Sequence, residues 1–466
     1  MKINQFEDLK NRTNKIVIKR MKKIIIGIGL GIAVVNCFGQ TKNNFSFSVK
    51  QAVEFAMQNQ NDIKNAAITE ELARKRVSET IGTGLPQINS SFDVKDFIEI
   101  PTQVFPAEAF GGPPGVLAAV KFGLQYQATA GFDASQLLFS SDYIIGLKGS
   151  KVYVSLSTKN VQRTKIETAA TVSKAYYMVL VSTERLKLMD ANIARVKKTM
   201  DDTKALMDNG FVEKIDFDRI TVTYNNLIVE QEKINRLLKV GTYLLKYQMG
   251  MDVNADLSLT DKLDDVKVDI GVLAQPDKFD YSKRIEYGIM ETQFKLAKID
   301  LKRQNLAFLP FAYAYGNLSG NAFRNDFNVF DTYRPWYPTA LIGATIKMPI
   351  FSGFQHGVKV QEAKLNVQQA ENNMDFIKKS IDLDLASSIA NLTNAASSLE
   401  NQKKNIKLAE DVVNVAKKKY DQGIGSNLEL VTAETALQET QTNYYNALYD
   451  AIIAKIDFDK ANGNLK

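Results

Sequence analysis

An internal duplication runs through nearly the whole 466-residue chain and constrains its fold more than any local motif. Three short motifs occur twice, in the same order: Leu85-Pro86 and Leu309-Pro310, Phe139-Ser140 and Phe351-Ser352, Asp208-Asn209-Gly210 and Asp421-Gln422-Gly423. Their offsets are 309 − 85 = 224, 351 − 139 = 212 and 423 − 210 = 213 residues. Because a repeat of this length copies a whole structural unit, the sequence predicts one architecture built twice.

Positive charge is concentrated at the N-terminus. The formal net charge of +7 and the pI near 9.0 are typical of nucleic-acid-binding and membrane-surface proteins. The first 23 residues carry eight lysines and arginines against two acids, a net of 8 − 2 = +6, which leaves 7 − 6 = +1 for the rest of the chain. The charge balance therefore gives no support to a nucleic-acid-binding function.

The same N-terminal charges precede an apolar run, residues 24–35, and a small-x-small end at Cys37 and Gly39. This pattern predicts a secretory signal peptide over residues 1–39, cut after Gly39, in which residues 1–20 are an upstream start-site extension before Met21. Two alternatives stay open. A transmembrane anchor would need about 20 apolar residues, and Cys37 could instead carry a lipid.

The sequence offers little chemistry for catalysis. Cys37 is the only cysteine and His356 the only histidine, so the predicted mature chain has neither a disulfide nor a thiolate metal site. We expect no catalytic residues, no metal and no cofactor, and predict that the protein is not an enzyme.

Two long helices are predicted, one in each repeat. Between Ile144 and Asn209, apolar residues recur at intervals of 3, 4, 3 and 4, the seam of a coiled coil. The segment from Lys359 to Asp421 has a similar pattern, and each helix would be about 90–100 Å long. Since a second helical pattern follows each glycine motif, the sequence predicts two antiparallel helical hairpins.

Before each long helix the hydrophobic period changes to two. Four segments alternate apolar and polar residues in this way: Gln87–Val94, Phe122–Phe132, Pro310–Ser319 and Pro338–Ile350. The 11 residues of Phe122–Phe132 have the length and alternation of a tilted strand that crosses a bilayer, and the other three segments are its weaker partners. Together the four segments predict two β-hairpins, one per repeat. Four strands cannot close a barrel, so strands in a membrane would require several chains to share one barrel.

The predicted domain organisation follows the duplication. Residues 40–250 form the first repeat, residues 251–282 an inter-repeat linker and residues 283–466 the second repeat. The fold class is mainly α with β: each repeat has a β-hairpin and a long antiparallel helical hairpin.

These motifs resemble the outer-membrane factor (TolC-like) family. The resemblance rests on Leu-Pro and Phe-Ser at the changes of period and on residues 420–423, Tyr-Asp-Gln-Gly, followed by Asn427-Leu428-Glu429-Leu430. It implies a homotrimer with a 12-stranded barrel in the outer membrane and a periplasmic helical tunnel. It also implies a passive exit duct of a tripartite efflux or type I secretion system, docked at its glycine-motif end to a periplasmic adaptor and an inner-membrane pump.

The resemblance further implies a gate at the periplasmic tip. An acidic residue six positions after each motif glycine, here Asp216 and Glu429, would take part in the constriction, and Tyr420 would bond Asp216. Thr432 occupies the place of a second constricting aspartate, and Gly425 that of an arginine. Carboxylates from three chains around a narrow pore would attract cations and could bind them tightly enough to block flow.

Simpler roles remain possible for the same residues. Asp216 and Glu429 could be helix N-terminal charges that the macrodipole favours. The predicted docking surface comprises tip residues of both hairpins: Gly210, Gly423, Gly425, Leu428 and Leu430. The alternative function is a periplasmic coiled-coil adaptor or scaffold subunit of an export pump, which would explain the helical hairpins but not the four alternating segments.

Overall fold

The computed structural model describes residues 44–263, 279–331 and 333–465. The predicted signal peptide, including Cys37, lies outside these residues. The described residues of the first half form ten elements: β1 (Asn44–Phe47), α2 (Val49–Asn59), α3 (Asn61–Thr83), β2 (Gln87–Asp96), β3 (Thr102–Pro106), η1 (Ala107–Phe110), β4 (Leu117–Lys121), β5 (Tyr126–Phe139), α4 (Ser141–Asp208) and α5 (Lys214–Met249).

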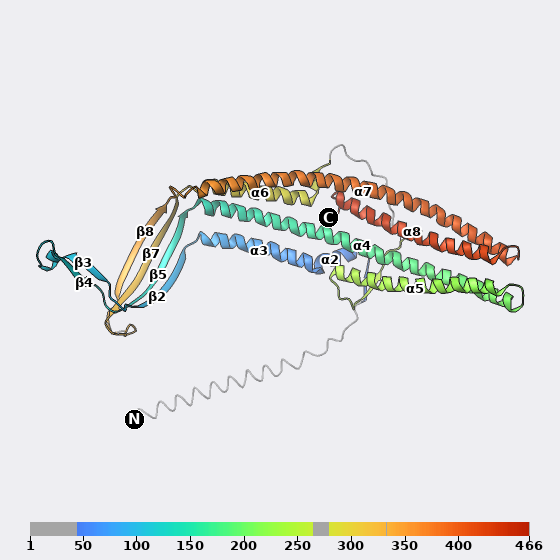
Figure 1. The fold of residues 1–466 in the computed structure, drawn as a ribbon, viewed down its shortest axis with the longest axis horizontal. Coiled ribbons are helices and arrows are strands. Elements are labelled where there is room, and N and C mark those ends of the chain that lie inside the picture. Colours follow the sequence, from blue (N-terminus) through green and yellow to red (C-terminus); the bar gives the residue numbers. More distant parts are fainter. Residues whose placement is uncertain (1–43, 264–278, 332, 466) are drawn as a thin grey trace, which may run out of the picture.

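The second half repeats the plan in shorter form. Its described elements are β6 (Asp256–Leu259), η3 (Tyr281–Lys283), α6 (Ile285–Leu306), β7 (Phe311–Arg324), β8 (Tyr337–Lys347), α7 (Gln355–Asp421) and α8 (Asn427–Ala461). Figure 1 shows a sheet at one end of an elongated molecule and two helical hairpins that reach to the other end. The predicted fold class is confirmed.

The four main strands form one antiparallel sheet in the order β2-β5-β7-β8. Strands were predicted close to three of these positions, and the structure extends β2 and β7 beyond them. The predicted strand from Phe122 is wrong at its start, because β5 begins only at Tyr126. Gly123 has a φ of +129°, which interrupts the extended backbone and separates β5 from β4.

The pair β3 and β4 forms a separate two-stranded hairpin that no sequence pattern predicted. It extends from the end of the sheet that lies away from the helices (Figure 1). Residues 111–114, which contain two glycines and two prolines, lie at its tip between η1 and β4. The hairpin was missed because its strands are only five residues each, too short for a period to be read with certainty.

The two faces of the main sheet differ in polarity. Asn317 on β7 donates to Asp133 on β5, and Asn321 bonds both Thr129 and Thr339, all on one face. The opposite face carries Ile88, Ala130, Leu318 and Ile342 among other apolar residues. Such alternation is typical of strands with a lipid-facing side and an aqueous side.

The long helices α4 and α7 contain 68 and 67 residues, about 100 Å each at the usual helical rise. Near the sheet, α4 packs against α3 on one side and α6 on the other, with α7 beyond α6. Toward the tip, α5 takes the place of α3 and α8 that of α6 (Figure 1). Two antiparallel hairpins, α4–α5 and α7–α8, result, as predicted. No helix of the described residues is long and apolar enough to cross a membrane.

At mid-length, β1 and β6 pair in parallel, with Asn44 opposite Asp256 and Phe47 opposite Leu259. The separation, 256 − 44 = 212 residues, equals the offset between the two Phe-Ser motifs, so the ladder joins equivalent residues of the two repeats. The Tyr176 hydroxyl on α4 donates to Phe47 O at 3.0 Å and fixes this sheet on the helices. We propose from this register that the second repeat begins at β6, inside the segment predicted as a linker.

Candidate functional site

The two hairpins turn through identical backbone geometry at the tip. Gly210 and Gly423 adopt φ values of +76° and +70° one residue after the helix C-cap. The next residue then bonds back to the helix, Phe211 N–H to Leu206 O at 2.9 Å and Ile424 N–H to Lys419 O at 3.0 Å. This is the Schellman arrangement, which needs glycine because side chains with a Cβ disfavour positive φ. The duplicated glycines therefore end the helices, as the sequence predicted.

The two predicted gate acids lie in the first turns of the returning helices, Asp216 in α5 and Glu429 in α8. Each is paired within its own hairpin: Asp216 with Arg219 at 3.3 Å, and Glu429 with Lys419 at 3.0 Å. Ser426 also caps α8 by accepting the Glu429 N–H. Both acids therefore lie where the helix macrodipole favours a negative charge. This position fits the simpler role of stabilising the start of α5 and of α8.

Tyr420 makes a different bond from the one predicted. Its hydroxyl lies 3.1 Å from Thr203 Oγ1, on α4, while Asp216 is occupied by Arg219. Thr203 is fully buried and donates its own proton to Thr199 O at 2.8 Å, so Tyr420 is the donor to Thr203. The expected Tyr420–Asp216 bond is therefore wrong for this chain, and Thr203 is the partner in the first hairpin.

A second bond joins the hairpins at the tip. Asn427, at the start of α8, is buried and donates its side-chain N–H to the backbone carbonyl of Asp216 at 3.0 Å. The predicted acid therefore contributes to the contact between the hairpins through its main chain. Because the α7–α8 turn places Asn427 beside α5, this link and the Tyr420–Thr203 bond hold the two hairpins together from both sides of the turn.

Further from the tip, α4 and α8 are joined by polar groups in a largely buried contact. Arg195 binds both carboxylate oxygens of Glu434, with Nη2–Oε2 at 2.7 Å and Nε–Oε1 at 3.0 Å. Asn192 donates to Gln441 at 2.6 Å. The sequence did not predict these four residues, because a polar residue in a helical seam has the same sequence pattern whether it is buried or exposed to solvent. Only the packing of one hairpin on the other shows that these lie in a largely buried contact.

Three other predicted tip residues have clear positions. Thr432 is exposed on α8. Leu430 is 1% exposed and packs with Val413, Leu437 and Tyr420 inside the second hairpin, so its prediction as a docking residue is wrong. A Cβ on Gly425 would lie 2.8 Å from Lys419 Cβ and 2.9 Å from Tyr420 N. The close turn therefore explains why glycine stands where the family resemblance suggested arginine.

Four large apolar side chains are exposed at the tip, two on each hairpin. Phe211 and Ile424 follow the two glycines and are 78% and 75% exposed; Ile215 and Leu428 lie one turn further on and are also exposed. The pairs are equivalent in the duplication, since 424 − 211 and 428 − 215 both equal 213. Phe211, Ile215 and Ile424 were missed, and applying the repeat offset to Leu428 would have found Ile215.

Metal chemistry has no support among the described residues, in which no group of three or more histidine, cysteine or acidic side chains is suited to hold an ion. His356 lies in the first turn of α7, with its ring 5.0 Å from that of Phe308. The described part of the tip has hydrogen bonds between the two hairpins, which suit mechanical closure. It also has exposed apolar side chains, which suit contact with another protein.

Comparisons with known proteins agree with this architecture. The family model described as outer membrane efflux protein matches residues 297–464. TolC of Vibrio cholerae is 19% identical over 347 residues, 72% of this chain and 77% of the relative. The probable efflux pump outer membrane protein TtgC of Pseudomonas putida is 22% identical over 344 residues, 73% of this chain and 69% of the relative.

Solved structures share the fold. The CusC channel superposes with a TM-score of 0.72 at 16% identity, covering 89% of this chain and 92% of that one. The CmeC outer membrane channel of Campylobacter jejuni gives a TM-score of 0.70 at 16% identity, covering 89% and 85%. The matched family model, the TolC and TtgC relatives and the shared fold together support the outer-membrane factor (TolC-like) family for this chain.

Proposed function

We propose that this protein is the outer-membrane exit duct of a tripartite efflux or type I secretion system, a passive channel gated at its periplasmic tip. The observation that carries the proposal is the continuity of a sheet with one apolar face and two helical hairpins of about 100 Å. In the assembled channel the sheet would form the wall within the membrane, and the helical hairpins would continue that wall through the periplasm. Cargo specificity would lie with the pump.

The open edges call for several chains in one barrel, and the family resemblance implies that there are three. The outer strands β2 and β8 have no partner on their far sides within the described sheet, and lipid tolerates no such edge. Three chains would supply twelve strands by pairing β2 of one with β8 of the next. Large apolar side chains exposed along α7, including Leu365, Phe376 and Leu383, support a matching contact between neighbouring helices.

Gating would consist of separating the two hairpins at the tip. The Tyr420–Thr203 and Asn427–Asp216 bonds cross between hairpins, whereas Asp216–Arg219 and Glu429–Lys419 lie within them. Moving α7–α8 away from α4–α5 would break the first pair and leave the second intact. We therefore assign the latch to Tyr420, Thr203 and Asn427, with Asp216 held by its main chain.

Adaptor docking would use the exposed apolar tip. Phe211 and Ile215 on one hairpin and Ile424 and Leu428 on the other form equivalent pairs, six per trimer, suited to a repeated apolar contact. The adaptor's own role is a poorer fit for this chain, because a periplasmic scaffold has no use for a sheet with an apolar outward face.

Conductance in planar bilayers tests the gate. The double variant Tyr420→Phe with Thr203→Val removes the hydroxyl link while keeping both shapes, so we expect a higher closed-state conductance. Tyr224→Phe on α5, whose ring packs in the first hairpin, is the matched control and should behave as wild type. Unchanged conductance in the double variant would exclude these residues as a latch.

The Asp216 side chain is tested separately. If the carboxylate acts in the constriction, Asp216→Ala should raise conductance and weaken block by divalent cations. If it only favours the start of α5, both properties should remain as in wild type. Recovery of the protein as a soluble periplasmic monomer, without a heat-sensitive trimer band in outer-membrane fractions, would contradict the duct itself.

A further inference from the structure

A groove lies on the apolar face of the sheet, near the end away from the helices. One row of paired residues crosses all four strands there: Phe92 opposite Ala130, Ala130 opposite Gly320, and Gly320 opposite Pro338. Because paired residues share a face, this row lies on the same side as Leu318 and Ile342. It therefore belongs to the apolar side, opposite the one that holds the Asn317–Asp133 bond.

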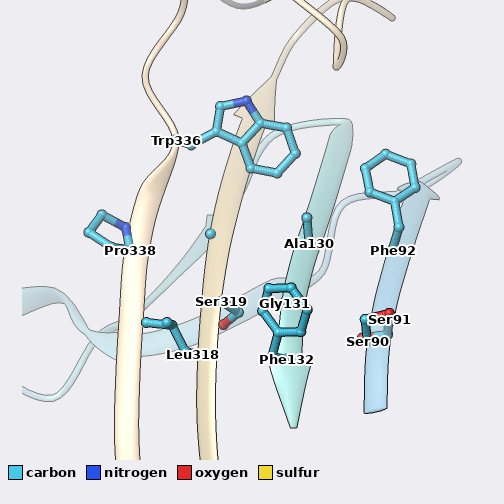
Figure 2. A pocket seen from close by; sticks show the side chains of 11 residues that line it. Ser90, Ser91, Phe92, Ala130, Gly131, Phe132, Leu318, Ser319, Trp336 and Pro338 are labelled. Atoms are coloured by element: carbon cyan, nitrogen blue, oxygen red, sulfur yellow. The ribbon is translucent and has the colours of Figure 1, made fainter. Parts of the chain in front are cut away.

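The groove has a floor of small residues between aromatic walls. Its volume is about 800 Å³, and its lining includes Ala130 and Gly320, with Phe92, Phe132 and Trp336 as the large rings. Figure 2 shows Ala130 between the Trp336 and Phe92 rings. No charged side chain lines the groove; on this face its polar side chains are the Ser90 hydroxyl and the indole N–H of Trp336, since Ser91 and Ser319 lie at the alternate positions.

The chain after β7 folds back over this apolar face and builds one wall of the groove. Val329 is fully buried against Ala128 and Ala322 on the outward face, and Phe330 stacks on Phe92 with ring centroids 5.9 Å apart. This packing fixes the segment on the apolar face of the strands, away from the polar face.

An arginine holds the end of the same segment. Arg324, at the end of β7, is 4% exposed and donates from both terminal nitrogens to Pro335 O at 3.3 Å. This carbonyl directly precedes Trp336, so the two bonds position the indole at the edge of the groove. The wall is thus held by hydrogen bonds and packing, as in a built site.

We propose that the groove binds one acyl chain of a membrane lipid in the extracellular leaflet. The proposal rests on the proposed function, which places this end of the sheet at the outer surface of the membrane. The groove shares its face with the exposed side chains of Ile342 and Ile346, where bilayer hydrocarbon would lie. An apolar lining with few hydroxyls matches an alkyl chain, because any charged or strongly polar ligand would lose its hydration there without compensation.

Trp336 makes the proposal directly measurable, since it is the only tryptophan of the chain. The protein is reconstituted into phosphatidylcholine vesicles whose acyl chains carry bromine, which quenches indole fluorescence on contact. We expect strong quenching of wild type, and we expect Ala130→Leu, which fills the floor of the groove, to lose most of it. Ala344→Leu adds the same side chain on the same face of β8, outside the groove, and should leave the quenching unchanged.

A second variant guards against misfolding. A Cβ on Gly320 would lie 3.3 Å from the Trp336 ring, so Gly320→Ala narrows the groove with a smaller change and should reduce the quenching partly. Equal quenching in wild type, Ala130→Leu and Gly320→Ala would mean that Trp336 meets only the surrounding bilayer, and would overturn the site. Conducting channels with unquenched Trp336 would overturn the lipid site alone, whereas protein that fails to insert would overturn the duct as well.

Discussion

Arg195 on α4 and Glu434 on α8 form a two-pronged ion pair between the hairpins, with Nη2 and Oε2 2.7 Å apart. The Glu434 side chain is only 4% exposed, whereas that of Arg195 is 30% exposed. Planar guanidinium and carboxylate groups bind strongly in this geometry. The pair therefore fixes the two hairpins at one level along the tunnel, above the latch at the tip.

Arg195→Met should destabilise the protein strongly. It keeps much of the side-chain volume but leaves Glu434 buried without a counter-charge, a loss that typically costs about 3–5 kcal/mol. Thermal unfolding followed by far-UV circular dichroism in detergent measures the effect. Lys404→Met breaks the exposed pair with Glu400 and serves as a control that should change little.

The double variant Arg195→Met with Glu434→Leu separates charge from packing. Since it removes the buried carboxylate together with its partner, most of the lost stability should return. If the double variant were no more stable than Arg195→Met alone, the loss would arise from packing and the buried charge would not be its cause.

Gly210→Ala and Gly146→Ala should act in opposite directions. A Cβ at either position meets nothing within 4 Å, so space does not distinguish them. Gly210 has a φ of +76°, where alanine is disfavoured by about 1–2 kcal/mol. Gly146 lies within α4, where alanine should stabilise by about 0.5–1 kcal/mol. Unfolding midpoints of the two variants check the signs, and a stabilising Gly210→Ala would contradict the turn geometry.

Acid should weaken the contact between α3 and α4. The hydrogen bond from Arg74, together with that from Thr158, holds the pKa of Glu70 below its ordinary value of 4.5. Because the unfolded chain then binds the proton more tightly, this contribution is present above pH 4.5 and is lost as the pH falls through the folded-state pKa.

Two variants measure this contribution through the pH dependence of the unfolding midpoint. Glu70→Gln should be less stable than wild type near neutral pH and approach it in acid, and Thr158→Val should show part of the same change. A constant difference between wild type and Glu70→Gln at all pH values would contradict the assignment.

Ile342→Lys and Leu341→Lys test which face of the sheet meets lipid. The residues are neighbours on β8 and point to opposite faces, and Ile342 lies near the middle of its ladder with β7, opposite Gly316. A lysine on the lipid face near the bilayer centre costs about 2–4 kcal/mol, whereas one on the aqueous face is tolerated. We expect less Ile342→Lys than Leu341→Lys in outer-membrane fractions. The reverse order would invert the assigned faces.

The sequence by itself determined the repeated architecture. The long helices, their glycine turns and three of the four main strands were predictable, because helical and strand periods and the demand of Gly210 and Gly423 for positive φ are local properties. The local pattern misled the prediction at Phe122. Apolar and polar residues alternate through Gly123, but the extended backbone is interrupted there by a positive φ. The predicted roles of Asp216 and Glu429 at the tip stay predictions.

Only the tertiary structure decided which polar groups meet. Tyr420 bonds Thr203, 217 residues away, and Arg195 bonds Glu434, 239 residues away, because the α7–α8 hairpin lies against α4 at one particular level. Side-chain partners across two packed helices depend on their rotation and axial shift, which a seam of apolar residues in either helix leaves unspecified. For the same reason, the apolar tip pairs and the groove beside Trp336 became visible only once the helices and strands were assembled.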